Sequence, residues 1–190
     1  MRTRLLALLV VAAAPLSARA QDDNPYKDAK VGDFATFKMT MKVGGGEVTG
    51  TVTSKVTAKT EKEATVEASG KMAGTDIPPT TQKIDLTKPF DPTKVGNQIP
   101  GGGEAKVEKL KDGKEKLKVG DKTVETTWTT YKVSAKAMGA DIDAETKVWM
   151  SKDIPLGMAK MEMNAKVNIG GMSMDMVMTM ELEKSGNEKK

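Results

Sequence analysis

The chain has no cysteine and no histidine among its 190 residues, and its arginines all lie within the first twenty positions. Without histidine or cysteine, Ser-His-Asp and Cys-His nucleophile systems and histidine-based zinc sites are excluded. Without arginine after residue 20, bidentate arginine clamps on phosphate are excluded as well. The sequence also has no phosphate-binding glycine loop, dinucleotide fingerprint or nucleophile elbow. We therefore expect a protein that is not an enzyme and that uses no cofactor.

One set of acidic residues leaves a narrower catalytic or calcium-binding role open. Asp141, Asp143 and Glu145 alternate along one expected strand, and carboxylates alone serve some hydrolases and calcium sites. However, charges at every second position are also typical of the solvent-exposed face of a strand, and the glycine of an EF-hand loop is missing. We expect these three carboxylates to form a solvated surface.

The first twenty residues have the composition of a secretory signal peptide. Met1–Arg4 is basic, Leu5–Pro15 is apolar, and Leu16–Ala20 ends in an A-x-A pattern. The apolar run is too short to span a bilayer, and no second run follows. We expect cleavage near Ala20, a periplasmic or extracellular location, and no integral membrane segment in the mature chain. The lack of cysteine also rules out a lipid-anchored form and disulfide bonds.

After removal of the signal peptide the chain is almost neutral. Taking the three arginines from the 30 basic residues leaves 27 lysines against 26 acidic residues. Nucleic-acid-binding proteins usually carry a basic face rich in arginine. We therefore expect no nucleic-acid partner.

Alternation of apolar and polar residues predicts a mainly β protein. A single domain over 21–183 is expected to fold as a curved antiparallel sheet, a half-barrel or open barrel, of about eight to ten strands. One strand is expected at Glu63–Met72 and another near Gln82–Leu86. Residues 87–103, rich in proline and glycine, are expected to form a crossover loop or lid. The segment 104–111 is ambiguous, but its Ala, Glu, Lys and Leu content favours a short helix, and a disordered polar tail is expected over 184–190.

The clearest predicted element is a hairpin rich in methionine. Two alternating segments, 159–169 and 172–182, flank the turn Gly170-Gly171, and Gly-Gly is a preferred two-residue hairpin connection. The predicted register pairs Ile169 with Met172, Val167 with Met174, Ala165 with Met176, Met163 with Met178, and Met161 with Met180. On the other face this register sets unlike charges opposite one another, Lys166 with Asp175 and Lys160 with Glu181. Such opposed charges favour a register, and a slip of one residue would turn every apolar side chain outward.

Three interpretations of this methionine face remain open. Methionine fills irregular gaps in a core, so the face would then be ordinary packing. Unbranched, polarisable side chains also make an adaptable wall for a lipid or other hydrophobic small molecule. Thioethers are, in addition, soft ligands that select Cu(I). The candidate ligand-binding residues are Met161, Met163, Met174, Met176, Met178, Met180, Trp128 and Trp149. The candidate Cu(I) ligands are Met161, Met163, Met178 and Met180.

The order of several short segments resembles that of exported bacterial proteins of the LolA/LppX-like half-barrel type. The segments are Val31–Phe34, Gly113–Val119 and Val148–Lys160. The resemblance implies a curved antiparallel sheet around an apolar cavity that carries lipid. Carriers of the LolA type use an arginine inside the cavity, and this chain has none after residue 20.

Three functions are compatible with these observations. The first is a non-enzymatic exported protein that binds or carries a lipid or another hydrophobic ligand. The second is a periplasmic Cu(I)-binding protein that uses the methionine cluster. The third is a structural envelope protein without a ligand.

Overall fold

The computed structural model describes residues 24–90, 105–137 and 140–188. They form one nine-stranded antiparallel sheet with the strand order β4-β3-β2-β1-β9-β8-β7-β6-β5. The strands are β1 (Asp33–Val43), β2 (Gly46–Lys59), β3 (Glu63–Met72), β4 (Thr75–Asp85), β5 (Ala105–Val119), β6 (Lys122–Ala137), β7 (Ala140–Met150), β8 (Met158–Ile169) and β9 (Met172–Asn187). The expected signal peptide and most of the expected 87–103 loop lie outside the described residues.

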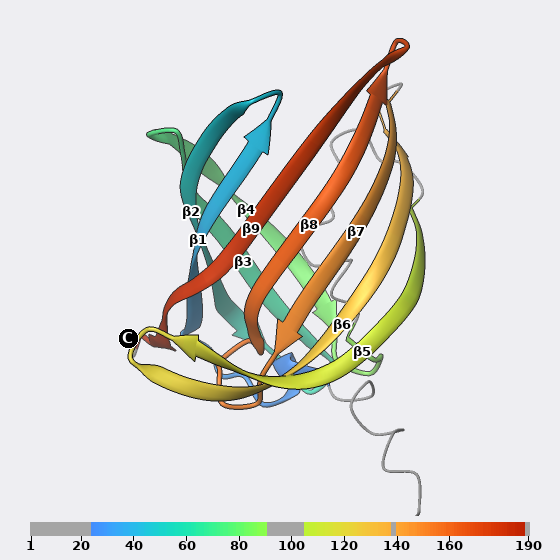
Figure 1. Ribbon diagram of the computed structural model, residues 1–190. Coiled ribbons are helices and arrows are strands. Elements are labelled where there is room, and N and C mark those ends of the chain that lie inside the picture. Colours follow the sequence, from blue (N-terminus) through green and yellow to red (C-terminus); the bar gives the residue numbers. More distant parts are fainter. Residues whose placement is uncertain (1–23, 91–104, 138–139, 189–190) are drawn as a thin grey trace, which may run out of the picture.

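The sheet curves into an open half-barrel whose two edges are β4 and β5 (Figure 1). Strands that follow one another in the chain are neighbours, except β4 and β5, which form the opposite edges. At the centre of the sheet β1 pairs with β9 over Asp33–Val43. This pairing joins an N-terminal meander, β1 to β4, to a C-terminal meander, β5 to β9. The predicted antiparallel class and the predicted range of strand number are both confirmed.

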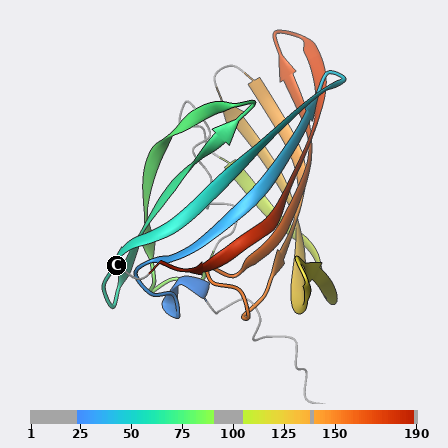
Figure 2. The same cartoon turned by 90° about the vertical axis from the view of Figure 1, so that its left-hand side faces the viewer.

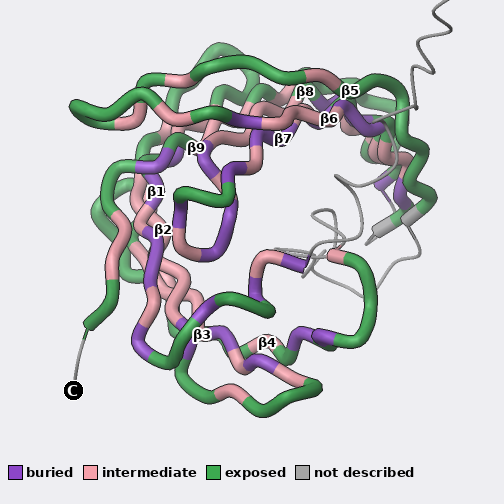
Figure 3. Tube along the Cα trace, turned by 90° about the horizontal axis from the view of Figure 1, so that it is seen from below, coloured by how far each residue is buried: buried purple, intermediate pink, exposed green. Residues whose placement is uncertain are grey.

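The two ends of the half-barrel differ. At one end, here called the tip end, lie the short turns β1–β2, β3–β4 and β8–β9 (Figures 1 and 2). At the other, the packed end, lie the 3-10 helix η1 (Pro25–Lys27) and the β7–β8 segment, which folds into the curve of the sheet (Figure 3). Asn24 begins η1 because its side chain accepts a hydrogen bond from the backbone of Tyr26.

The hydrophobic core fills the packed end. It combines apolar residues of the sheet with residues of the N-terminal and β7–β8 segments, and Val56, Ala35 and Ala64 at its centre are completely buried. The members that these inner segments contribute are Tyr26, Ala29, Ile154 and Leu156. Because these segments lie inside the curve, side chains that share a face with Phe37 and Leu182 of this core are on the concave side.

The helix expected at 104–111 was wrong. This segment is the first half of β5, which pairs with β6 from Ala105 to Val119. Its helix propensity amounts to a few tenths of a kcal/mol per residue, and the hydrogen bonds to a long neighbouring strand outweigh it. Gly113 lies within the strand, opposite Trp128.

Two strand boundaries also differ from expectation. The fourth strand begins at Thr75 and includes Pro78 and Pro79. Proline is tolerated there because β4 is an edge strand and its pairing with β3 shifts register opposite the two prolines, between Ala68 and Gly70. The expected polar tail at 184–190 begins too early, since β9 continues to Asn187, which pairs with Asp33 of β1. The expected strand Glu63–Met72 coincides with β3.

Candidate functional site

The predicted methionine hairpin is confirmed in its register. Ile169 pairs with Met172, and the pairing continues without a shift to Met161 with Met180 and Lys160 with Glu181. Lys160 lies 3.0 Å from Glu181 and 2.9 Å from Glu162. Burial alone would lower the pKa of Lys160, but its hydrogen bonds to these two carboxylates outweigh that effect and raise the pKa. Lys160 therefore stays charged and stabilises this register.

Strand β1 extends the methionine face beyond the hairpin. Met39 pairs with Met180, and Met41 pairs with Met178. Two rows of methionines consequently cross β1, β9 and β8 on the concave side. We call the six side chains of these rows the methionine surface: Met39, Met41, Met161, Met163, Met178 and Met180.

The methionine surface is only partly covered. Met39, next to the core residue Phe37, is buried, whereas the other five side chains are half-buried. Toward the tip end the same face continues through Met176, which is half-buried, to Met174, which is 39% exposed. The packed core thus ends at the first methionine row, and an increasingly exposed apolar surface begins there.

Residues of β6 and β7 complete the concave face beside the methionines. Val148 lies opposite Met161, Thr146 lies opposite Met163, and Tyr131 lies opposite Thr146. All three are buried. The two rows thus cross five neighbouring strands, in the order β1, β9, β8, β7 and β6. Neither row contains a charged side chain.

Trp128 and Trp149 do not lie with the methionines. Trp149 pairs with Lys160, which points to the face opposite Met161, and Trp128 pairs with Trp149. Both indoles are therefore on the convex side, because neighbouring residues of a strand point to opposite faces. The prediction that they line the same ligand surface as the methionines was wrong.

Trp149 instead packs against an arm formed by residues 113–128 of β5 and β6, and Trp128 is the last residue of this arm. The arm lies on the outer, convex side of the sheet and crosses the lower ends of β7 to β9 (Figures 1 and 3). Lys147 Nζ lies 4.3 Å from the ring centroid of each tryptophan. The Trp149 indole N–H donates to Glu115 of the arm, and this hydrogen bond is the main reason why the pKa of Glu115 is lowered. Trp149 is an apolar residue on the same face of β7 as Asp141, Asp143 and Glu145. The arm covers it, so it is buried although it lies on the convex face.

The acidic residues of β7 lie on a solvent-exposed face of the strand, as expected. Asp141, Asp143 and Glu145 are exposed. Asp141 pairs with Lys136 at 3.2 Å, and Asp143 accepts a hydrogen bond from Ser134 at 2.7 Å. Among the described residues, no group of three or more His, Cys, Asp or Glu side chains is arranged to hold a metal ion.

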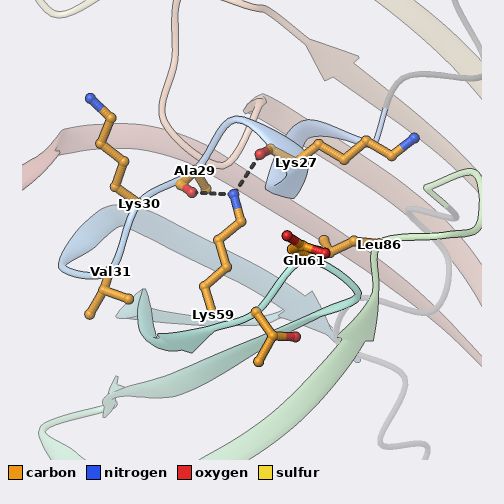
Figure 4. A pocket seen from close by; sticks show the side chains of 8 residues that line it. Lys27, Ala29, Lys30, Val31, Lys59, Glu61 and Leu86 are labelled. Carbon is orange, nitrogen blue, oxygen red and sulfur yellow. Dashed lines mark hydrogen bonds between the residues drawn. The ribbon is translucent and has the colours of Figure 1, made fainter.

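A separate pocket of about 770 Å³ lies at the packed end, between the N-terminal segment and the β2–β3 turn (Figure 4). Leu86 and Ala29 are its buried apolar residues. Lys59 reaches across it and donates to the backbone carbonyls of Lys27 and Ala29 at 2.5 and 2.6 Å. Its ammonium group therefore ties the N-terminal segment to the sheet. Nearby, burial raises the pKa of Tyr26 to about 12, so this phenol stays neutral.

Comparisons with known proteins give little further guidance. No family model matches the chain, and no curated protein matches it. A solved structure from Bacteroides fragilis NCTC 9343, of a protein predicted to be exported and with a YmcC-like fold, is similar. It has a TM-score of 0.46 and 9% sequence identity, over 84% of this chain and 97% of that one. The LolA/LppX-like family is not found by these comparisons. None of the described helices is long and apolar enough to cross a membrane.

Proposed function

We propose that this chain is an exported, non-enzymatic protein that binds a lipid or another flexible hydrophobic ligand on its methionine surface. The observation that carries the proposal is the partial exposure of five methionines on a concave face whose lower end is closed by the core. A side chain needed only for packing is normally covered once the protein has folded. These five remain accessible on the inside of the curve.

The chemistry of methionine supports a ligand of adaptable shape. Its unbranched thioether changes rotamer at little cost and makes favourable dispersion contacts with varied apolar groups. Because the two rows contain no charged side chain, a ligand needs no charged group to bind there. An acyl chain, which is long, flexible and apolar, fits a strip that runs from the buried Met39 toward the exposed Met174.

Binding of an environment-sensitive apolar fluorophore, together with native mass spectrometry of the purified protein, tests this function. Met163→Asp would place a carboxylate within the methionine surface, and we expect the affinity for the fluorophore to fall at least about tenfold. Asn164→Asp is the matched control, because Asn164 is the next residue of β8 and is exposed on the convex side. The control should bind as the unaltered protein does.

Two outcomes would contradict the proposal. One is a protein that purifies without any lipid and does not bind the fluorophore, which would favour a structural role. The other is an equal loss of binding in Met163→Asp and Asn164→Asp, which would mean that the affinity does not depend on the methionine surface.

A second candidate function is Cu(I) binding. The observation that favours it is the pairing of Met161 with Met180 and of Met163 with Met178, since it places thioethers at directly opposed positions of neighbouring strands. Competition with a Cu(I) chelator under anaerobic conditions tests it. If Leu at all four positions leaves the affinity for Cu(I) unchanged, this candidate is excluded.

A further inference from the structure

The hairpin turns at the tip end are apolar and uncharged. The three described turns there are Val43–Gly46, Met72–Thr75 and Ile169–Met172. At the packed end, in contrast, the β2–β3 turn contains Glu61 and Lys62. The two ends of one sheet thus differ in polarity, although both are made of short connections between the same kinds of strand.

Large apolar side chains are exposed at these tips. Met172 is 70% exposed and Ile169 is 43% exposed. Of the eight exposed large apolar residues among those described, five lie in a tip or within five residues of one: Val43, Ile169, Met172, Met174 and Val177. Burying a single side chain of this size contributes about 1.5–3 kcal/mol, so this concentration indicates a surface that something covers.

The tips are narrow projections. Gly170 and Gly171 have positive φ angles of 58° and 85°, as the central residues of a two-residue hairpin turn require. A Cβ atom on either glycine would meet nothing within 4 Å. The hairpins therefore end as separate points along a curved rim (Figures 1 and 2). A rigid protein partner would need a matching set of cavities, whereas a fluid surface accepts separate points wherever they lie.

Ion pairs lie near the tip end of three strand pairs, β1–β2, β3–β4 and β6–β7. They are Lys42 with Glu47 at 3.3 Å, Lys71 with Asp76 at 3.5 Å, and Lys136 with Asp141 at 3.2 Å. Lys42 and Lys71 are each two residues from the first central residue of their turns, Gly44 and Ala73, which corresponds to about 7 Å along a strand. Each pair carries one positive and one negative group, as does the headgroup of a zwitterionic phospholipid.

We propose that the tip end docks on the surface of a zwitterionic phospholipid bilayer. The apolar tips enter the boundary between headgroups and acyl chains, and the ion pairs lie among the headgroups. The distance of about 7 Å agrees with the roughly 5–10 Å to which amphipathic surface elements enter a bilayer. Because Val43 pairs with Met176, docking would also bring the concave apolar face next to the acyl region. The proposal goes beyond ligand binding and does not depend on it.

Flotation of the purified protein with phosphatidylcholine vesicles tests the proposal. We expect the double variant Ile169→Asp with Met172→Asp to bind vesicles at least about tenfold more weakly. The matched control is Asn168→Asp with Ser173→Asp, a pair of the same hairpin that faces the other side of the sheet. Val43→Asp repeats the test on a second hairpin. Binding should change little with salt, because each ion pair is balanced in charge and the main attraction is apolar.

Several results would overturn the proposal. These are no flotation of the unaltered protein, an equal loss in the variant and control pairs, or binding that salt abolishes. A dimer that the tip variants dissociate, seen by analytical ultracentrifugation, would assign the tips to a second copy of the chain. Met163→Asp should lose the fluorophore but keep vesicle binding, so the two proposals fail independently.

Discussion

At the scale of single residues, two glycines set how closely β2 and β3 approach one another. A Cβ atom on Gly50 would lie 2.2 Å from the Lys71 carbonyl oxygen, and one on Gly70 would lie 2.1 Å from the Thr51 carbonyl oxygen. Both contacts are with the backbone of the neighbouring strand, which cannot turn aside as a flexible side chain can. Glycine at these positions is therefore required by space.

We predict that Gly70→Ala lowers the free energy of unfolding by about 1–3 kcal/mol, because β2 and β3 must move apart to admit the methyl group. Urea denaturation followed by circular dichroism measures the change. Gly46→Ala is the control, since its Cβ atom would have an ordinary contact of 3.5 Å with the Val43 carbonyl oxygen. Equal stability of Gly70→Ala and the unaltered protein would show that the two strands separate freely.

At the scale of elements, the sequence predicts some strands well and others poorly. The β8–β9 hairpin could be predicted to the residue, because its alternation, Gly-Gly turn and opposed charges all favour the same register. The first half of β5 could not, since its lysines and glutamates have helix propensity and only the pairing with β6 makes it a strand. Local patterns determine an element where they agree, and distant partners determine it where they conflict.

The same reasoning explains which part of the methionine surface was predictable. Four of its residues follow from the hairpin alone. Met39 and Met41 also alternate along a strand, but their place beside Met180 and Met178 depends on pairing between β1 and β9, at opposite ends of the chain. No local signal indicates that pairing. The buried place of Trp149 on the convex side could not be predicted for the same reason, because the arm that covers it comes from β5 and β6.

We predict that the register of the β8–β9 hairpin depends on Lys160. Lys160→Glu would place three carboxylates together, with Glu162 and Glu181, and we expect it to destabilise the fold by about 1 kcal/mol or more. Adding Glu181→Lys should restore part of the loss, because the pair is then reversed rather than removed. Urea denaturation of both variants measures this coupling. If the second substitution fails to restore any stability, the ion pair does not contribute to the register.

At the scale of the whole molecule, two meanders are held together by one pairing at the centre of the sheet. Strands β1 and β9 have neighbours on both sides, whereas β4 and β5 have a strand on one side only. Local opening costs least where few neighbouring strands protect the backbone. The sheet should therefore open from its edges inward.

We predict that backbone amides of β1 and β9 exchange with deuterium most slowly, and those of β4 and the first half of β5 most rapidly. Hydrogen exchange followed by mass spectrometry of peptides from each strand measures this order. The second half of β5 is a separate case, because it belongs to the arm packed over β7 to β9. If β4 is protected as well as β1, opening does not proceed from the edges.

The two free edges also bear on how the protein behaves at high concentration. An edge strand has unpaired N–H and C=O groups with which the backbone of another copy can pair, and successive additions build fibres. On β4, two adjacent prolines interrupt the row of amide donors, and on β5, six lysines repel a second copy of the same strand. We therefore expect both edges to resist the addition of further strands, so that the open half-barrel does not form fibres even at high concentration.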